Sequence, residues 1–157
     1  MTPALKRCQS AKISFQVHEY VHDASTESYG MEAAEKLSVA VDRVFKTLVV
    51  KLNTGELVVC VIPVSSMLDL KLLANVANAK KAEMAEQSVV QRSTGYVIGG
   101  VSPIGQKRKL RTFLDTSAEP FSTIFISGGR RGLEIELAPM DLINITRGNT
   151  AALCRSK

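Results

Sequence analysis

The segment VFKTLVVKLNTGELVVCVIPV, residues 44–64, decides the fold because it holds two apolar runs rich in β-branched side chains. The first run covers residues 44–52, the second covers residues 56–64, and Asn-Thr-Gly at residues 53–55 separates them. Valine and isoleucine favour strands, and a short connection that contains glycine is typical of a β-hairpin. The segment therefore predicts two strands that pair antiparallel.

Further short strands and helices are expected on both sides of this hairpin. Alternating or continuous β-rich runs predict strands at residues 13–17, 111–115, 123–127 and 133–137. Short helices are expected after a Thr2 cap with Pro3 in the first turn, at residues 31–37, from an Asp69 cap through residue 79, at residues 86–92, and from Pro139 onward. This order predicts an α/β (α+β) fold, with a mixed, curved sheet or a partly closed barrel surrounded by short helices.

Length and composition fit one domain with a charged surface. The chain has 157 residues, 45% of them hydrophobic, and no repeat or linker divides it, so we expect a single domain over residues 1–157. The formal net charge is +5. Clustered cations are either a solvated loop or a surface for a polyanion, and neighbouring glycine turns favour the polyanion. The two clusters are Lys107, Arg108, Lys109 with Arg111, and Arg130 with Arg131.

The cysteines and the apolar segments indicate a reducing compartment. Cys8, Cys60 and Cys154 lie at wide, irregular spacing, which predicts neither a disulfide framework nor a zinc ribbon. None of them has the surroundings of a nucleophile. No segment reaches the roughly 20 apolar residues that cross a bilayer, and the N-terminus lacks an apolar signal core. We expect a cytoplasmic protein that neither contacts a membrane nor uses a cofactor.

The pentapeptide His18-Glu19-Tyr20-Val21-His22 matches the H-E-x-x-H pattern of zinc peptidases. That pattern binds zinc on a helix, where both imidazoles share one face. The preceding residues alternate with period two, and on a strand the two histidines would lie about 13 Å apart. The sequence also lacks a nucleophile elbow, a phosphate-binding P-loop and a dinucleotide fingerprint. We therefore expect no metal site and no nucleophile supplied by the protein.

The stretch RSTGYVIGGVSPIGQKRK, residues 92–109, sets a glycine pair and a Ser-Pro turn before a run of cations. Glycines let the backbone approach a ligand closely. Lys46 interrupts an apolar strand, where a buried ammonium costs free energy unless it faces an anion or a pocket. The alternatives are an edge-strand lysine and ordinary turns. Since the strand at residues 123–127 also ends in Gly128-Gly129, we expect these three features to converge on one pocket.

Six short motifs spread over the chain carry a family resemblance: MTPA at 1–4, FKTL at 45–48, QRSTGY at 91–96, GGVSP at 99–103, GQK at 105–107 and SGG at 127–129. With them the chain resembles the YbaK family of free-standing aminoacyl-tRNA deacylases, relatives of the editing domain of bacterial prolyl-tRNA synthetases. The resemblance covers the chain to about residue 146. It implies the fold of that editing domain, hydrolysis of Cys-tRNA(Pro) and of Cys-tRNA(Cys), and a transient partnership with prolyl-tRNA synthetase. We expect a monomer.

The resemblance also implies roles for individual residues. The essential lysine of the family falls on Lys46 and its Gly-x-x-x-Pro loop on residues 99–103, so the expected catalytic groups are Lys46, Gly99 and Gly100. The expected substrate-binding residues are Tyr20, Tyr29, Thr47, Ser102, Pro103, Ser127, Gly128, Gly129 and Glu134. Tyr29 stands where phenylalanine is common and Glu134 where a shorter residue is found, so contacts there differ in reach. The expected tRNA-binding residues are Lys107, Arg108, Lys109, Arg130 and Arg131.

In the mechanism implied by this resemblance, the thiol of the substrate attacks its own ester carbonyl. A pocket that separates side chains by one small group gains only about 1–3 kcal/mol, whereas a well-oriented intramolecular attack reaches effective molarities of roughly 10⁵–10⁸ M. Lys46 and backbone N–H groups near Gly99 and Gly100 are expected to orient the substrate and stabilise the oxyanion. Two alternatives stay open: a deacylase of Ala-tRNA(Pro) or another small aminoacyl-tRNA that activates water, and a non-catalytic tRNA-binding module.

Overall fold

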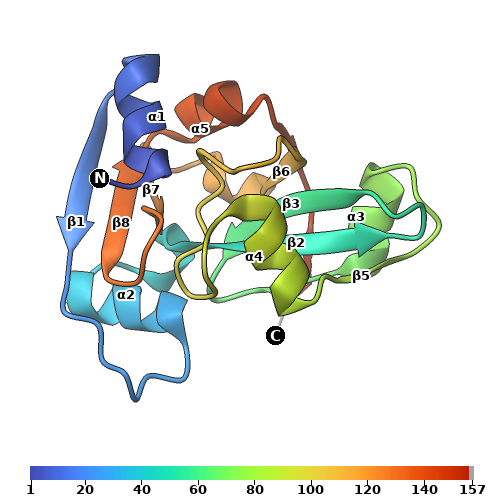
Figure 1. Ribbon diagram of the computed structural model, residues 1–157. Coiled ribbons are helices and arrows are strands. Elements are labelled where there is room, and N and C mark those ends of the chain that lie inside the picture. The colour runs from blue at the N-terminus through green and yellow to red at the C-terminus, as the bar shows by residue number, and fades with distance from the viewer. Residues whose placement is uncertain (156–157) are drawn as a thin grey trace.

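The computed structural model describes residues 1–155 and places the predicted hairpin in a five-stranded sheet (Figure 1). β2 (Phe45–Leu52) and β3 (Leu57–Pro63) pair antiparallel, with Lys46 opposite Ile62. β3 pairs in parallel with the next strand of the sheet, so the sheet is mixed. The strand order is β5 (Ala82–Met84), β2, β3, β6 (Arg111–Asp115) and β9 (Asn149–Ala151). The predicted hairpin is therefore confirmed.

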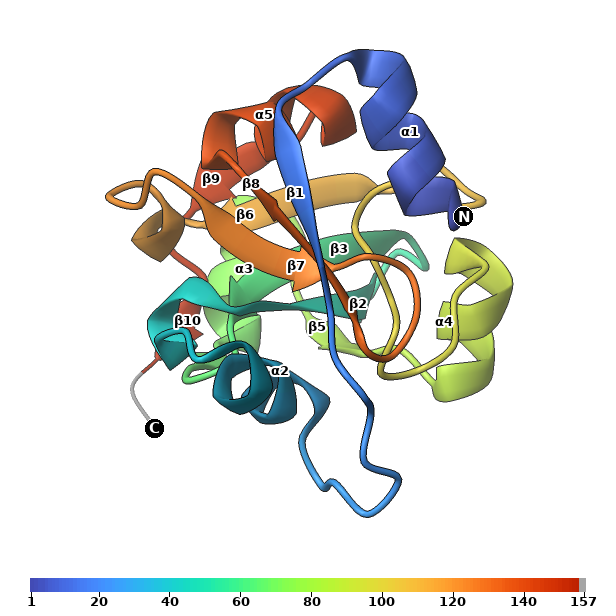
Figure 2. The same cartoon turned by 90° about the vertical axis from the view of Figure 1, so that its left-hand side faces the viewer.

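A second sheet of three antiparallel strands crosses the first (Figure 2). A parallel bridge between Val44 and Phe125 connects the start of β2 to the second sheet. The order in this sheet is β1 (Phe15–Glu19), β8 (Leu133–Leu137) and β7 (Ile124–Ser127), and a third pairing joins β4 (Met67–Leu68) to β10 (Cys154–Arg155). The predicted mixed α/β fold is confirmed, and within residues 1–155 the sheets do not close into a barrel.

Short helices surround the sheets, and capping side chains fix several of their starts. They are α1 (Pro3–Ala11), α2 (Tyr29–Leu37), α3 (Leu70–Val76), α4 (Gln87–Thr94) and α5 (Pro139–Thr146), with 3₁₀ turns at Val41–Arg43 and Thr116–Ala118. The Thr2 hydroxyl accepts the Leu5 N–H, and the Asp69 carboxylate accepts the N–H of the first turn of α3. No helix in the described part of the chain is long and apolar enough to cross a membrane.

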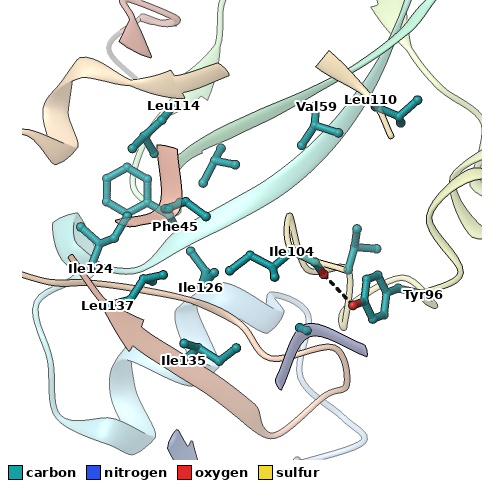
Figure 3. Close-up of a cluster of buried hydrophobic side chains, with 14 of the residues drawn as sticks. Phe45, Val59, Tyr96, Ile104, Leu110, Leu114, Ile124, Ile126, Ile135 and Leu137 are labelled. Atoms are coloured by element: carbon teal, nitrogen blue, oxygen red, sulfur yellow. Dashed lines mark hydrogen bonds between the residues drawn. The ribbon is translucent and has the colours of Figure 1, made fainter. Parts of the chain in front are cut away.

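The main hydrophobic core lies between the two sheets (Figure 3). Phe45 and Val59 face it from the five-stranded sheet, and Ile126 and Ile135 face it from the other sheet. The opposite face of the five-stranded sheet packs against α3, so every residue of β3 is buried. Each buried aliphatic or aromatic side chain contributes roughly 1.5–3 kcal/mol. The sheets around the site are thus held by packing on both faces.

The same core positions the glycine loop, residues 97–105. Tyr96 is buried just before the loop, and its hydroxyl donates to the Ile104 carbonyl at 2.7 Å (Figure 3). Ile104 is 1% exposed and belongs to the core. Both ends of the loop are therefore anchored, and the residues between them are held in place.

The structure departs from the sequence predictions at short edge strands and at the ends of several elements. The predicted strand at residues 13–17 is shifted to Phe15–Glu19, α2 begins two residues before the predicted residue 31, and α4 ends two residues after the predicted residue 92. The helix capped by Asp69 ends at Val76 rather than at Ala79, because Asn78 adopts a left-handed conformation with φ of 59°. β4, β5, β9 and β10 were not predicted, and each has only two or three residues. Runs of that length are too short to show the alternation by which a strand is identified.

Candidate active site

A cavity of about 310 Å³, the main cavity, opens where β2 and β7 diverge beyond the Val44–Phe125 bridge. β2 supplies one wall, the end of β7 and the start of β8 supply another, and the turn before α2 and the glycine loop complete it. The structure brings seven of the predicted site residues together at this cavity: Tyr20, Tyr29, Lys46, Thr47, Gly99, Ser127 and Glu134. Three segments distant in sequence thus meet as the sequence predicts.

The edge of β2 offers main-chain groups to the main cavity. On the β3 side, the Val44 carbonyl accepts the Val64 N–H and the Leu52 N–H donates to the Glu56 carbonyl. On the opposite side, the Val49 carbonyl accepts the Ala85 N–H. In an antiparallel pair, successive residues point their N–H and C=O alternately to the two sides. The N–H and C=O of Thr47 therefore face away from β3, toward the divergence that forms the cavity.

The hydroxyl of Thr47 is the feature of the cavity wall that folding alone does not explain. In the described residues its Oγ1 is the buried side-chain polar atom without a hydrogen-bond partner. Buried polar groups are nearly always paired, since leaving one unpaired costs about 1–3 kcal/mol. The residue lines the main cavity. A ligand group in the cavity could supply the missing partner.

Lys46 is a basic residue of β2 that lines the main cavity. It is half-buried and lies in the cavity wall with Thr47 and Leu48. The Lys46 charge also acts on Cys154. Burial raises the pKa of that thiol to about 12, and the Lys46 ammonium opposes the rise. An ammonium at this position favours negative charge that develops in the cavity.

Glu134 places a neutral carboxyl in the wall at neutral pH. It is 7% exposed on β8, opposite Ser127 on β7, and burial raises the pKa of its carboxyl to about 8. Burial also raises the pKa of the neighbouring Tyr20 to about 12, together with the negative charges that Glu134 and Glu32 carry at the alkaline pH where this tyrosine ionises. Both groups are therefore protonated at pH 7 and can donate hydrogen bonds to a ligand.

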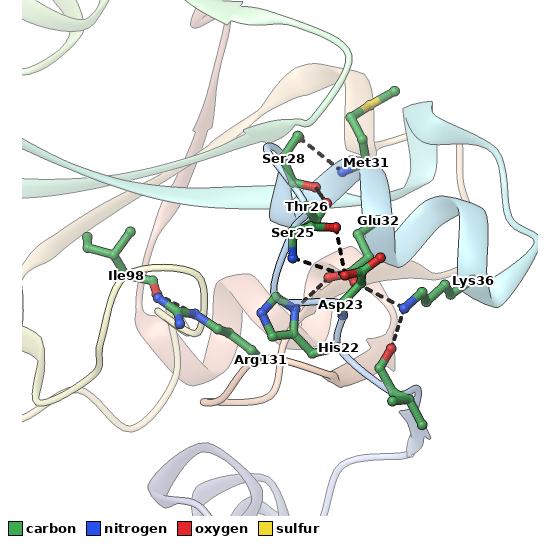
Figure 4. A network of polar contacts seen from close by, with 11 residues as sticks. His22, Asp23, Ser25, Thr26, Ser28, Met31, Glu32, Lys36, Ile98 and Arg131 are labelled. Atoms are coloured by element: carbon green, nitrogen blue, oxygen red, sulfur yellow. Dashed lines mark hydrogen bonds and ion pairs between the residues drawn. The ribbon is translucent and has the colours of Figure 1, made fainter.

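Gly99 lies at a three-way contact on the rim of the main cavity. Its φ of 91° is in the left-handed region, and a Cβ there would lie 2.7 Å from Arg131 Nε and 3.0 Å from the Tyr29 ring. The Arg131 guanidinium donates to the Ile98 carbonyl at 3.0 and 2.7 Å (Figure 4) and stacks 4.7 Å from the Tyr29 ring centroid. Only glycine fits this contact, which joins the glycine loop to the first residue of α2.

Three of the other residues of the predicted Gly-x-x-x-Pro loop, namely Gly100, Ser102 and Pro103, do not line the main cavity. A Cβ on Gly100 would lie 2.6 Å from the Arg130 main chain, so this glycine permits the loop to pack on the β7–β8 turn. Ser102 is fully buried and its hydroxyl accepts the Ile104 N–H at 3.3 Å. Pro103 lines a different cavity. These three residues support the loop, whereas Gly99 and Val101 line the main cavity.

The glycine pair after β7 also packs against protein. A Cβ on Gly128 would lie 2.7 Å from the Leu133 side chain, and one on Gly129 would lie 2.9 Å from the Tyr96 ring. The Gly128 carbonyl accepts the Thr2 hydroxyl, which ties the start of α1 to this turn. Neither glycine lines the main cavity, whereas Ser127 just before them does.

Comparison with known proteins identifies the family. A family model described as the aminoacyl-tRNA editing domain matches residues 25–145, which include β2, the glycine loop and β7. The chain belongs to the aminoacyl-tRNA editing domain family. The match includes six of the seven predicted residues at the main cavity, all except Tyr20.

Individual members and relatives of this family cover the chain to different extents. EbsC of Enterococcus faecalis, named as a candidate Cys-tRNA(Pro)/Cys-tRNA(Cys) deacylase, is 38% identical over 152 residues, 97% of this chain and 92% of its own length. Proline–tRNA ligase of Brachyspira hyodysenteriae is 26% identical over 91 residues, 58% of this chain and 16% of the ligase. The crystal structure of a candidate trans-editing enzyme for prolyl-tRNA synthetase has a TM-score of 0.84 at 24% identity and covers 99% of both chains. That likeness establishes a shared fold.

The two histidines of this editing domain belong to separate polar networks. His18 lies in β1, which confirms the predicted strand but shifts it by two residues from the predicted 13–17, and its Nε2 contacts Glu136 Oε1 at 2.8 Å. His22 Nδ1 contacts Glu32 Oε1 at 2.8 Å in a network that also holds Asp23 and Lys36 (Figure 4). Among residues 1–155, no group of three or more His, Cys, Asp or Glu side chains could hold a metal ion.

The three thiols of the editing domain stay protonated near neutral pH. Burial raises the pKa of Cys8 to about 11 and that of Cys60 to about 12, and Cys154 is raised likewise. A thiol is nucleophilic as the thiolate. No cysteine lines the main cavity.

The predicted cations lie outside the main cavity, on its rim and on the following loop. Arg130 pairs with Glu19 at 3.1 Å, and both side chains are largely exposed. Lys107, Arg108 and Lys109 are exposed, and the first two bind α4 through their backbone N–H groups. Arg131 differs because its guanidinium is held by Ile98 and Tyr29.

The sequence prediction missed several residues of the cavity wall. Glu27, Ser28 and Gly30 come from the turn that leads into α2, and Ile98 and Val101 come from the glycine loop. One signal for the turn was present in the sequence: Ser28 caps α2 by accepting the Met31 N–H. The apolar residues carried no signal, because nothing in their type separates a cavity wall from a core.

Proposed function

We propose that this protein, as a single domain over residues 1–157, is a trans-editing deacylase that hydrolyses mischarged Cys-tRNA(Pro), and also Cys-tRNA(Cys). The observation that carries the proposal is a cavity lined by Lys46, Thr47 and Gly99 in a member of the editing family, with no cysteine and no histidine in its wall among the residues that the structure describes. The likeness to EbsC over 97% of the chain supports the choice of amino acid.

In the proposed reaction the substrate supplies the nucleophile. The cysteinyl thiol loses its proton, its sulfur attacks the ester carbonyl, and the bond to the terminal ribose oxygen breaks, with that oxygen taking a proton. The product is a cyclic thioester, which water opens to free cysteine. A thiol with a reference pKa near 8.5 is a few per cent thiolate at neutral pH, and its attachment to the ester makes the attack intramolecular.

The cavity groups would orient the ester and stabilise the charge that develops on its carbonyl oxygen. Lys46 contributes an ammonium, and the β2 edge at Thr47 contributes an N–H and a hydroxyl. Glu134, with its pKa raised to about 8, is uncharged at pH 7 and does not oppose a developing negative charge. Gly99 brings the main chain of the glycine loop to the cavity wall, beside the proposed substrate site.

A second candidate function is hydrolysis of Ala-tRNA(Pro), or of another small aminoacyl-tRNA, by an activated water. One observation favours it: a general base works best when its pKa lies near the working pH, and the Glu134 carboxyl has a pKa of about 8 in the cavity wall. Glu134→Gln separates the candidates, because it abolishes a reaction that uses Glu134 as a base and spares one driven by the substrate thiol.

The cations around the cavity are proposed to hold the tRNA backbone without reading its sequence. Lys107, Arg108 and Lys109 with the Arg130–Arg131 pair would contact phosphates, an interaction that weakens as salt is added. Choice of tRNA then comes from prolyl-tRNA synthetase, which would hand over its mischarged product in a transient contact. We place the reaction in the cytoplasm and assign it to a monomer.

The test compares Cys-tRNA(Pro), Ala-tRNA(Pro) and Ser-tRNA as substrates of wild type, Lys46→Ala and Lys51→Ala. Lys51 lies on the same strand as Lys46, is exposed and does not line the cavity, so its variant controls for charge and strand structure. We expect cysteine to be released fastest and Lys46→Ala to be at least about 100-fold slower. Equal rates for the lysine variants would refute the role of Lys46, faster release of alanine would favour the water route, and no turnover would leave a non-catalytic tRNA-binding module.

A further inference from the structure

A second cavity of about 290 Å³ lies at the other end of the glycine loop. Four cations from three separate parts of the chain line it: Arg7 on α1, Arg108 and Lys109 before β6, and Arg147 directly after α5. α1 and α5 lie at the same end of the molecule in both views (Figures 1 and 2). Among residues 1–155, no aspartate or glutamate lines this cavity.

These four basic side chains form no ion pair with an acidic side chain of the described residues. Within residues 1–155 no ion pair involves any of them, and the side-chain hydrogen bond found among them joins Arg7 to Ser10 at 3.3 Å. All four are exposed. Like charges gathered around one cavity repel each other, and an anion in the cavity removes that repulsion.

We infer that the second cavity is a binding site for the phosphodiester backbone at the acceptor end of aminoacyl-tRNA. Arginine is suited to phosphate because its planar guanidinium presents parallel N–H donors, and three of the four cations are arginines. The site adds Arg7 and Arg147 to the cations recognised from the sequence. The inference rests on the proposed function for its choice of ligand.

The glycine loop connects this site to the main cavity. Ile98, Gly99 and Val101 line the main cavity, whereas Pro103, Ile104 and Gly105 line the second one. Four residue steps separate Gly99 from Pro103, which is at most about 14 Å of chain. When the aminoacyl ester of a tRNA lies in the main cavity, the last few phosphates of the same RNA strand are therefore within reach of the second cavity. A small free anion is not connected to the ester, so the short distance between the two cavities would not favour its binding.

The experiment measures binding of uncharged tRNA(Pro) as a function of KCl concentration. Arg7→Gln/Arg147→Gln removes two charges from the second cavity, and the control Lys80→Gln/Lys81→Gln removes two exposed charges that line neither cavity. The logarithm of the binding constant falls as the logarithm of the salt concentration rises, and each phosphate contact adds about 0.7–0.9 to the steepness of that fall. We therefore expect the arginine double variant to show a slope that is shallower by roughly 1.5, and the lysine double variant to keep the wild-type slope. Thermal unfolding of both variants verifies that they fold.

Two further readouts separate the possible outcomes. Equal slopes for the two double variants would overturn the site, even if the protein deacylates Cys-tRNA(Pro) normally. If the arginine variant showed the shallower salt dependence of tRNA binding while wild type deacylated none of the substrates, the second cavity would be upheld as a tRNA site and the proposed function would be defeated. Inorganic phosphate that binds wild type and not the arginine variant, while tRNA binding is unaffected, would replace tRNA with a small phosphate and overturn the inference.

Discussion

Glu134→Gln is expected to remove a pH dependence of folding stability that wild type shows between pH 5 and pH 8. Burial raises the pKa of this carboxyl from 4.5 to about 8 in the folded protein. As the pH rises through that range, the unfolded chain releases the Glu134 proton while the folded chain retains it, which favours the unfolded state. The stability that the neutral carboxyl contributes is thus complete below pH 4.5 and is lost by about pH 8.

The magnitude follows from the size of the shift. A rise from 4.5 to about 8 corresponds to about 5 kcal/mol in total, of which about 3 to 4 kcal/mol is lost between pH 5 and pH 8. For a domain of this size, 1 kcal/mol changes the melting temperature by about 2–4 °C, so the loss amounts to about 10 °C. Glutamine has nearly the same shape and does not ionise, so the variant escapes this loss.

The assay is urea unfolding of wild type, Glu134→Gln and Glu83→Gln at pH 5, 6.5 and 8. Glu83 is an exposed glutamate on β5, and its variant controls for the removal of one acidic side chain. Wild type and Glu83→Gln should lose stability in parallel as the pH rises, while Glu134→Gln loses about 3 to 4 kcal/mol less. If all three proteins followed the same pH profile, the reasoning about a buried neutral carboxyl would be refuted.

Two further predictions concern the main cavity. Thr47→Val should leave the free energy of unfolding within about 0.5 kcal/mol of wild type, because the hydroxyl has no partner to lose. The same variant should slow deacylation about tenfold. A stability loss above about 1 kcal/mol in urea unfolding would mean that the folded protein already pairs this hydroxyl. Arg131→Lys keeps the charge and loses the contacts to Ile98 and Tyr29, so kcat should fall while the salt dependence of tRNA binding stays at the wild-type value. Arg130→Lys is its matched control, and equal kcat values for the two variants would contradict a positioning role for Arg131.

The long elements could be predicted from the sequence because local pattern and burial agree in them. The strands at Arg111–Asp115 and Leu133–Leu137 have the predicted bounds, and Thr2, Asp69 and Pro139 mark helix starts as expected. The edge strands β5 and β9 could not be predicted, because pairing with a neighbour makes them strands and their own three residues carry no periodicity.

The sequence predicted which residues belong to the candidate site better than it predicted where each of them lies. Sequence motifs indicated Lys46, Thr47 and Gly99, which line the main cavity. They also indicated Ser102 and Gly128, which pack behind it, because a motif records residues that shape a loop as well as residues that reach a ligand. The cluster of Arg7 with Arg147 had no sequence signal, since the two lie at opposite ends of the chain.

The open edge of β2 has a consequence for how copies of this protein behave in solution. A free strand edge is a template on which a strand from another molecule can add, which is how many sheets aggregate. Here β5 covers residues 50–52 of β2, and Val44 is bridged to Phe125. The stretch of this edge that β5 leaves uncovered therefore spans residues 45–48, in which Lys46 and Leu48 direct their main-chain groups toward β3. Four residues are fewer than the five or six of a typical strand. The protein can therefore offer main-chain groups to a small ligand while it denies them to a neighbouring molecule.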